Sequence, residues 1–264
     1  MTHTTGWDRR LSVAADGKGL IGHVGAVLLR KLADRTGLTV ALAGVLPSAG
    51  GHGWRDRGAV LVQLAVAIVL GARNMTGAEA LQAHHQSLFG PAMSDSTTRR
   101  TLADLDGRLS VLARARAHER RHVRTLLTLR PGGFPRLTIA GKVLHRWIVI
   151  DMDATIITAA SKKDGASATW KSYGFHPLAA WCANTGECLA MRLRTGSASS
   201  NAVADHLKVL SEALAQTPGA STEKILVRVD GAGAAHGLHE NLPRSEHLAP
   251  HRPLHQRLDD HGRG

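Results

Sequence analysis

The stretch Arg146-Trp-Ile-Val-Ile-Asp-Met-Asp-Ala-Thr-Ile-Ile-Thr158 decides the fold class of this chain, because it is apolar almost throughout and rich in β-branched residues. This composition is typical of a strand that is buried on both faces of a sheet. Side chains alternate along a strand, so four residues are expected to share one face: Val149, Asp151, Asp153 and Thr155. Carboxylates in such a strand are costly unless a metal ion or another cation balances them.

The segments that follow predict a hairpin and then a helix. Residues 176–183 and 187–195 are expected to pair, since Asn184-Thr185-Gly186 between them are turn residues. A helix is predicted to begin at Ser199 or Ser200, because leucine and valine then recur at steps of four, three and four: Val203, Leu207, Leu210 and Leu214.

A second long strand is predicted at 224–230, where Lys-Ile-Leu-Val-Arg-Val-Asp precedes Gly-Ala-Gly. The order strand, hairpin, helix, strand fits a mixed sheet in which a right-handed helical crossover returns the chain. The last strand can then lie parallel to the first. Asp153 and Asp230 could therefore meet side by side, although they are far apart in the sequence.

Two carboxylates at neighbouring strand ends indicate a site for Mg²⁺ or Mn²⁺, since these ions prefer hard oxygen ligands. A pair of such ions can activate an attacking oxygen and stabilise the leaving oxygen in phosphoryl transfer. Alternatively, Asp153 and Asp230 only form turns where the two strands end.

Residues 1 to about 130 are predicted to be helical. A helix-like stripe that ends at Gly37 is formed by Leu28, Leu29, Leu32 and Leu38. Further helices are expected over the apolar run 59–70 and from Thr76. Another helix is expected to begin near Ser94, whose hydroxyl can cap it, and to continue through the leucines at steps of three and four: Leu102, Leu105, Leu109 and Leu112.

The helical region is rich in arginine, and the whole chain carries a formal net charge of +12 at pH 7. So basic a chain favours a polyanionic partner, of which nucleic acid is the commonest. The helices around 94–124 are expected to bind DNA, in particular through Arg99, Arg100, Arg108, Arg120, Arg121 and Arg124. The alternatives are a solvated helix face and the arginine enrichment that a GC-rich genome produces.

Composition narrows the class of protein further. The two cysteines, Cys182 and Cys188, are too few for a disulfide framework and wrongly spaced for a zinc knuckle, so we expect free thiols in a reduced compartment. The N-terminus lacks an apolar signal core, and the longest apolar run, 58–71, is shorter than the roughly 20 residues that span a bilayer. We therefore expect a cytoplasmic protein that enters no membrane.

Three regions are expected along the chain. Pro131-Gly-Gly-Phe-Pro135 looks like a hinge, so a helical region is placed at 1–135 and an α/β region at 136–237. Residues 238–264 hold five of the 16 histidines and three prolines but no Val, Ile, Met or aromatic residue. We expect this tail to be disordered and hypothesise that the reading frame was lost near Gly237. An ordinary His-rich tail is the alternative.

Three other features have weaker interpretations. His118-Glu-Arg-Arg-His122 matches the zinc-protease pattern, but the surrounding arginines should repel Zn²⁺ and favour a surface helix. Gly17-Lys-Gly-Leu-Ile-Gly22 matches a dinucleotide-binding pattern without the strand and the acid that such a site needs. Three aromatic residues are expected in the core, with stacking on an unpaired base as the alternative: Trp170, Tyr173 and Trp181.

Three motifs in one order carry a family resemblance: Ile150-Asp-Met-Asp-Ala-Thr155, Tyr173-Gly-Phe-His-Pro-Leu178 and Val227-Arg-Val-Asp-Gly-Ala-Gly233. Over residues 1 to about 237 the chain resembles bacterial insertion-sequence transposases of the DDE type. It looks most similar to the insertion sequence 1380 family, within the broader insertion sequence 4 group.

The resemblance implies a ribonuclease H-like catalytic domain at 136–237, after a helical DNA-binding region at 1–135. It also implies a cut at transposon ends that depends on Mg²⁺ or Mn²⁺, followed by strand transfer through a free 3′-hydroxyl. The family's first acid precedes a threonine, which Asp153 matches best, with Asp151 as the alternative. Its second acid ends a later strand before a small residue, which Asp230 matches.

The family's third acid is a glutamate on a helix well downstream of the second, usually after an inserted β-rich segment. Only 34 residues follow Asp230, and neither Glu240 nor Glu246 lies in such a context. The resemblance therefore implies an incomplete two-metal site and weak or absent cleavage.

The resulting expectation is a truncated transposase that binds terminal inverted repeats, with a homodimer on DNA ends as one arrangement. The main alternative is a non-catalytic DNA-binding protein that interferes with a full-length transposase. A nuclease of the same fold is a third interpretation.

Overall fold

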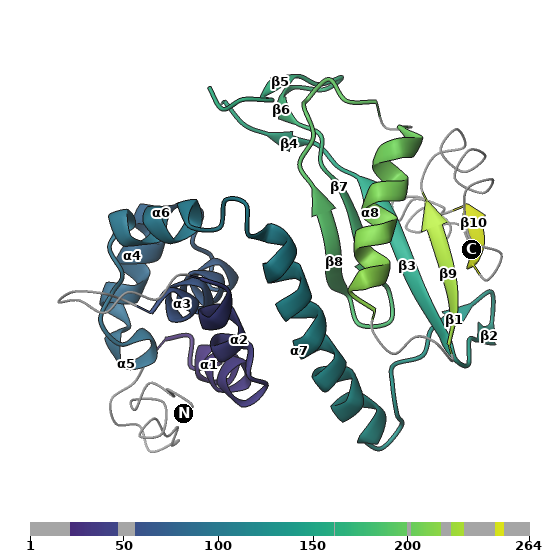
Figure 1. Cartoon of the computed structure of the whole chain (residues 1–264), viewed down its shortest axis with the longest axis horizontal. Coiled ribbons are helices and arrows are strands. Elements are labelled where there is room, and N and C mark those ends of the chain that lie inside the picture. Colours follow the sequence, from purple (N-terminus) through teal and green to yellow (C-terminus); the bar gives the residue numbers. More distant parts are fainter. Residues whose placement is uncertain are drawn as a thin grey trace, which may run out of the picture. The chain divides into compact units, whose positions relative to one another are not determined.

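The computed structural model describes residues 22–46, 56–160, 162–199, 202–217 and 223–229, and the backbone alone for 246–250 (Figure 1). The chain separates into two compact units, 1–123 and 124–264. They divide within helix α7 (Leu109–Leu129), upstream of the loop 131–135 that the sequence suggests as a hinge. Each unit has its own hydrophobic core, and each is described by itself.

The first unit is helical in all of its described elements, as the sequence predicts. Before α7 it contains α1 (Ala26–Arg35), α2 (Leu38–Val45), α3 (Arg57–Val69), α4 (Met75–His84), α5 (Gln86–Phe89) and α6 (Asp95–Ala103). The leucine stripe of α1 lies on its exposed side, where Leu28 is 72% exposed. Small residues and Arg30 form the buried side of this helix instead. No helix among the described residues is long and apolar enough to cross a membrane.

The prediction of one helix from Ser94 through Leu112 is wrong, because α6 ends at Ala103 and α7 begins at Leu109. The intervening turn contains Gly107 in a left-handed conformation, with φ of +67°. The turn is also held from α3, where Arg57 Nε lies 3.1 Å from Asp104 Oδ2. Leucine spacing cannot reveal this break, since the same spacing continues on both sides of it.

The core of the helical unit depends on a close approach between α2 and α3. A Cβ on Gly58 would lie 2.5 Å from Ala43 N and 2.6 Å from Thr39 O, distances that no side chain tolerates. Behind this contact α3 buries its apolar side, including Val62 and Val66. Its central polar residue, Gln63, donates through Nε2 to the carbonyl of Phe89 at 2.6 Å, whereas its buried Oε1 has no hydrogen-bond partner among the described residues.

The second unit is a mixed α/β structure, which confirms the predicted class at that level. Its elements after α7 are β1 (Thr138–Ile139), β2 (Lys142–Val143), β3 (Trp147–Ala154), β4 (Ile157–Thr158), β5 (Ser167–Ala168), β6 (Tyr173–Phe175), β7 (Leu178–Cys182), β8 (Glu187–Arg192), α8 (Val203–Ala215), β9 (Lys224–Val229) and β10 (Glu246–Pro250). The main sheet has the order β10-β9-β3-β7-β8. As predicted, β7 and β8 form a hairpin and β9 lies parallel to β3.

Helix α8 lies against one face of the main sheet (Figure 1). Ile148, Ile150 and Met152 of β3 pack there with Val209 and Leu210 of α8. Because these β3 residues alternate along the strand, the residues between them face the opposite side. That opposite side is the one that carries the aspartates.

One buried histidine belongs to the α8 side of the sheet. His206 is 2% exposed, and its Nδ1 lies 2.9 Å from the carbonyl oxygen of Ala202. Burial lowers the pKa of His206 below its usual value, more than the bond to Ala202 and the charge of Asp205 raise it. The uncharged imidazole is therefore the form that this packing favours at neutral pH.

The first long strand is shorter than predicted, because it leaves the main sheet after Ala154. Its antiparallel ladder with β7 ends at the pair Ala154 and Leu178, and the residue before Leu178 is Pro177, which has no N–H to donate. The chain then enters a separate three-stranded sheet of order β4-β6-β5. This small sheet is drawn beyond the end of β7 in Figure 1.

The structure differs from the prediction of a tail without regular structure at one place. Strand β10 pairs parallel with β9, from Glu246 opposite Ile225 to Pro250 opposite Val229. Pairing at a sheet edge uses backbone groups, so a segment without side-chain periodicity can still form it. The remainder of 238–264 lies outside the described residues.

We predict opposite effects for two glycine-to-alanine substitutions in the helical unit. Gly58→Ala should lower the free energy of unfolding by about 1–3 kcal/mol, because its methyl group must push α2 and α3 apart. Gly44→Ala is the matched control. Gly44 is exposed on α2 with open space around it, so alanine should stabilise the helix by up to about 1 kcal/mol.

Urea unfolding followed by circular dichroism measures both effects. Equal stability of the Gly58→Ala variant and the unsubstituted chain would contradict the close approach of these helices.

Candidate active site and nucleic-acid interface

The sheet face opposite α8 carries both aspartates of β3. Asp151 is partly buried and Asp153 is exposed. In the antiparallel ladder with β7, Asp151 is opposite Trp181 and Asp153 is opposite Ala179. Ala179 is fully buried, so the exposed Asp153 lies directly beside a covered part of β7.

Asp151 forms a two-pronged ion pair with Arg228 of β9. Arg228 Nε donates to Oδ1 of Asp151 at 2.5 Å, and Nη2 donates to Oδ2 at 2.6 Å. The two residues are directly opposite each other in the parallel register. Both carboxylate oxygens therefore already accept charge-assisted hydrogen bonds, and a metal ion would have to compete with a guanidinium for them.

Asp153 lies two residues further along β3, near the end where the strand leaves the main sheet. Its carboxylate is on the same face as that of Asp151, but its position is exposed. Thr155 follows at the start of the connection and donates its backbone N–H to Pro177 at 3.1 Å. Asp153 thus places a carboxylate at the end of β3, next to the turn that the hydrogen bond between Thr155 and Pro177 holds.

The second predicted acid, Asp230, lies outside the described residues. The last described pair of the parallel ladder joins Met152 to Val229. The next residue along each strand is an aspartate in the sequence, Asp153 on one and Asp230 on the other.

The residues present can be tested against the ligands that Mg²⁺ or Mn²⁺ needs. An exposed carboxylate such as Asp153 suits either ion, whereas Asp151 suits it less because Arg228 already binds both of its oxygens. Within the described part of the chain, no group of three or more His, Cys, Asp or Glu residues is placed to hold a metal ion.

The other two sequence motifs lie in the helical unit or outside the described residues. His118 and His122 are on α7, and the Glu119 carboxylate between them lies against Gly37, with Oε2 3.2 Å from where a Cβ would be. Of the glycine-rich pattern, only Gly22 is described.

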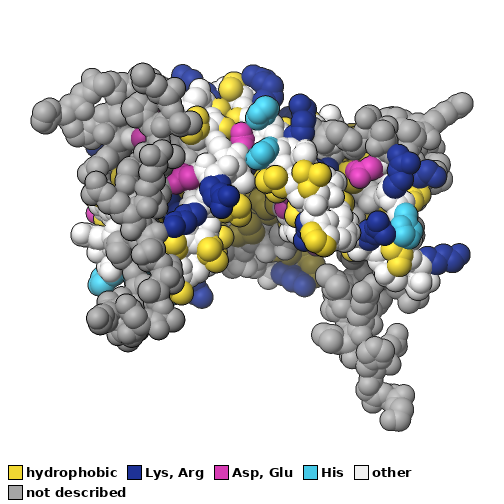
Figure 2. Space-filling view, turned by 90° about the horizontal axis from the view of Figure 1, so that it is seen from below, with side chains coloured by type: hydrophobic (Ala, Val, Ile, Leu, Met, Phe, Trp, Pro, Cys, Tyr) yellow, Lys and Arg dark blue, Asp and Glu magenta, His cyan; other side chains and the backbone are white. Residues whose placement is uncertain are grey.

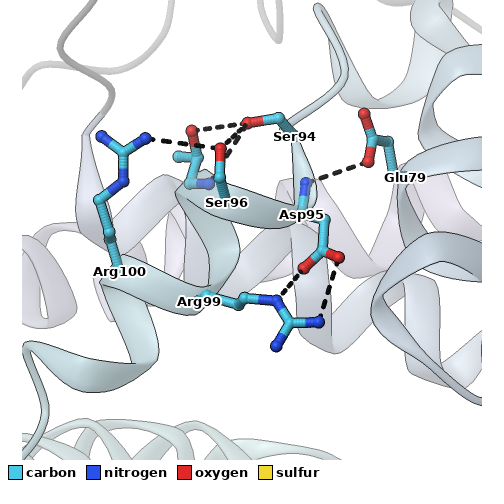
Figure 3. Close-up of polar contacts among 7 residues, drawn as sticks. Glu79, Ser94, Asp95, Ser96, Arg99 and Arg100 are labelled. Carbon is cyan, nitrogen blue, oxygen red and sulfur yellow. Dashed lines mark hydrogen bonds and ion pairs between the residues drawn. The ribbon is translucent and has the colours of Figure 1, made fainter.

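Helix α6 is rigidly held and presents two arginines (Figure 3). Ser94 caps the helix by accepting from Thr97 N at 3.3 Å, and Glu79 of α4 accepts from the backbone N–H of Asp95 at 3.0 Å. Arg99 Nε donates to Asp95 at 2.7 Å, and Arg100 reaches Ser96 at 3.4 Å.

The side chain of Arg99 is 66% exposed, although it forms an ion pair with Asp95. Arg100 is exposed as well. Both cations lie on the surface of a helix whose opposite side is anchored, since Thr98 and Thr101 are buried. This arrangement can present positive charge to a polyanion without rearranging the backbone.

The remaining predicted DNA-binding arginines differ in their surroundings. Arg108 donates to the carbonyl of Val45 at 3.2 Å, while Arg120 and Arg121 lie on α7, which has no buried residue. The surface in Figure 2 shows Lys and Arg side chains spread among hydrophobic ones. The positive charge is therefore distributed and not confined to α6.

Arg124 has a structural environment. Its side chain is only 11% exposed, and its Nη2 lies 3.8 Å from Cys182 Sγ and 3.9 Å from Glu187. Its guanidinium also lies 5.5 Å from the ring centroid of Phe134. These contacts tie the end of α7 to the sheet of the second unit, so this arginine is not offered to solvent as the others are.

Sequence reasoning missed two residues that shape the site. The role of Arg228 could have been predicted from the sequence, because a parallel register that joins Asp153 to Asp230 also places Arg228 opposite Asp151. Arg194 gave no such signal. It is 3% exposed on its side chain, and it donates to the carbonyl of His176 at 2.9 Å and to Asp205 at 3.3 Å.

A comparison with family models identifies the family of this chain. The family model described as "Transposase DDE domain group 1" matches residues 3–248, nearly the whole chain. The match therefore continues beyond residue 237, where the sequence resemblance was expected to end. A comparison with curated proteins gave no match. The family implies a transposase function, DNA binding and, in general, the use of divalent metal ions. The chain belongs to the DDE transposase domain family, group 1.

Proposed function

We propose that this transposase binds the terminal inverted repeats of an insertion sequence of the 1380 type and makes the metal-dependent cuts that precede strand transfer. The helical unit would supply the DNA-binding surface, and the mixed sheet would be a ribonuclease H-like catalytic domain. The observation that carries the proposal is the exposed Asp153 at the end of β3, in a chain of the DDE transposase family.

Asp153 is a better first catalytic acid than Asp151. Asp151 binds Arg228 through both of its oxygens, so its charge is balanced and its orientation is fixed by two hydrogen bonds. Releasing it for a metal ion would leave the partly buried Arg228 without its partner, which is unfavourable. Asp153 shares the face of Asp151 without this particular commitment to Arg228.

Asp230 is proposed as the second acid. Extending the parallel register by one residue beyond Met152 and Val229 pairs Asp153 with Asp230. Strand alternation would then place both carboxylates on the face away from α8, since Val229 packs in the core on the α8 side. Mg²⁺ or Mn²⁺ held there would activate the attacking oxygen and stabilise the leaving oxygen.

The chain's own residues would orient the DNA for this reaction. The Asp151–Arg228 pair sets the register of the two strands and so the distance between the proposed acids. Arg99 and Arg100, on anchored α6, would contact phosphates or base edges of the repeat. The remaining positive charge would contribute affinity that does not depend on sequence.

We further propose that cleavage by this polypeptide is weak compared with its DNA binding. No third carboxylate joins Asp153 within the described part of the chain. The alternative function is therefore a non-catalytic DNA-binding protein that competes with an active transposase for the same repeats. The two functions differ in whether end-labelled transposon DNA is cut at all when Mn²⁺ is present.

We predict that Asp153→Asn and Asp151→Asn separate metal binding from stability. Asp153→Asn should weaken Mn²⁺ binding about tenfold or more, because it removes one ligand charge, and should lower the free energy of unfolding less than Asp151→Asn does, because Asp153 is exposed. Asp151→Asn should instead lower the free energy of unfolding by about 1 kcal/mol, since Arg228 loses its ion pair.

Isothermal titration with Mn²⁺ and urea unfolding test this pair of variants, with cutting of end-labelled DNA as the activity readout. Loss of Mn²⁺ binding in Asp151→Asn but not in Asp153→Asn would reverse the assignment of the first acid.

We predict that Arg99→Ala together with Arg100→Ala weakens binding to terminal repeats and reduces the slope of log K against log salt by about 2. The matched control is Arg130→Ala with Arg136→Ala, which removes the same charge from exposed positions outside α6. Gel shifts at several salt concentrations, with unrelated competitor DNA, measure affinity and sequence preference together. An equal loss in both double variants would show that α6 acts only through total charge.

A further inference from the structure

A small sheet departs from the main sheet right beside Asp153. We call residues 155–176, of which residue 161 is outside the described part, the flap; it contains β4, β5 and β6. The flap begins where β3 ends and returns to the main sheet at β7. Its two ends are fixed, because Thr155 N donates to Pro177 O at 3.1 Å and His176 N donates to Arg194 O at 3.2 Å.

The interior of the flap is also closely packed. Gly174 has φ of +152°, and a Cβ there would collide with the carbonyl oxygen of Ile157. A Cβ on Gly196 would collide with the carbonyl oxygen of Ser167. Buried Arg194 reinforces the base by donating to the carbonyl of Ser199 at 2.8 Å. The flap is therefore a preorganised element whose surface features have a defined geometry.

A pocket of about 490 Å³ lies between the flap and the end of β3. That volume is within the range of roughly 300–1,000 Å³ typical of small-molecule sites. Ala154 and Thr155, the two residues after Asp153, form part of its wall. Thr158, Ser172 and His176 form the polar part of the lining. The hydroxyl groups of Thr158 and Ser172 lie 3.0 Å apart.

The pocket has an aromatic side that was expected to be buried. Trp170 lines the pocket and is 74% exposed, and nearby Tyr173 is 50% exposed, so the prediction of core positions for both is wrong. Lys171 Nζ lies 4.2 Å from the centroid of the Trp170 ring. The ammonium group therefore lies over one face of the indole, so a base would stack on the other face while the same ammonium group attracts its phosphate.

We propose that this pocket binds an unpaired nucleotide at a DNA end, with its base stacked on Trp170 and its phosphate near Lys171. The inference rests on the proposed function, which brings a DNA end to Asp153. A paired base inside a duplex cannot present its face to an indole, because its neighbours cover that face. The outer face of a terminal base pair is open, but an unpaired nucleotide can also turn its base into the pocket, so we assign a single-stranded terminal nucleotide as the occupant, held within a few residues of the acid that would cut the strand.

The test compares two DNA ligands that differ only at the end. One is a blunt duplex of the terminal repeat, and the other adds three unpaired nucleotides, with 2-aminopurine as the probe base. The full chain should bind the second ligand more tightly and quench its fluorescence. Trp170→Ala should remove this preference, about five- to a hundredfold, and leave affinity for the blunt duplex unchanged.

Two further variants sharpen the result. Trp170→Phe should keep part of the preference, because phenylalanine still offers a ring for stacking. Leu129→Ala is the matched control, since Leu129 is 77% exposed in the same unit but does not line the pocket. It should bind both ligands as the unsubstituted chain does.

The outcomes separate the inference from the function beneath it. Equal binding of both ligands by the unsubstituted chain, without quenching, would overturn the nucleotide pocket and leave DNA binding intact. An equal loss of affinity for both ligands in Trp170→Ala would overturn the nucleotide pocket as well, because the indole would then contact DNA without distinguishing an unpaired base from a duplex. Failure of the unsubstituted chain to bind either ligand would contradict the proposed function itself.

Discussion

The parallel pairing of β3 with β9 is the constraint on which the candidate active site depends, and the ion pair between Asp151 and Arg228 lies at its centre. A one-residue slip of a strand would move its side chains to the opposite face of the sheet. Such a slip would bury Arg228 on the α8 side and separate it from Asp151. The same slip would remove the proposed partner of Asp153, so one cross-strand contact stabilises the register that the chemistry requires.

Two acids on one strand face create a charge problem that the structure solves differently for each. Asp151 is balanced within the protein by a guanidinium that binds both of its oxygens. Asp153 lies closer to the strand end and is exposed, so solvent reaches its carboxylate. The sheet thus has one carboxylate that is held by an arginine and one that is accessible from solvent. The flap that begins just after Asp153 adds an aromatic surface to the same place.

Much of the fold could be predicted from local patterns. The long apolar strand, the hairpin around Asn184, helix α8 and the parallel return at 224 all follow from periodicity and turn residues. The flap did not, because strands of two or three residues are too short to show a period. The break between α6 and α7 was hidden for another reason: Gly107 and the contact from Arg57 to Asp104 end the helix inside a continuous leucine pattern.

The candidate site was only partly predictable for a related reason. Asp153 and Asp230 could be selected by strand position, but the role of Asp151 depends on Arg228, which joins it only through the tertiary register. Arg124 was expected to face DNA because it belongs to an arginine-rich helix. Its contacts with Cys182 and Phe134 come from a distant strand and a loop, so helix periodicity could not show them.

Paramagnetic broadening by Mn²⁺ tests most directly whether a metal site lies at the paired ends of β3 and β9. Substoichiometric Mn²⁺ is added to the ¹⁵N-labelled chain, and the loss of each backbone amide signal is recorded. The strongest losses are expected at Asp153, Ala154 and Val229, with much smaller losses at Trp147 and Lys224, which pair at the other end of the same two strands. Broadening centred on His118 and His122 of α7, or spread evenly over the surface, would contradict it.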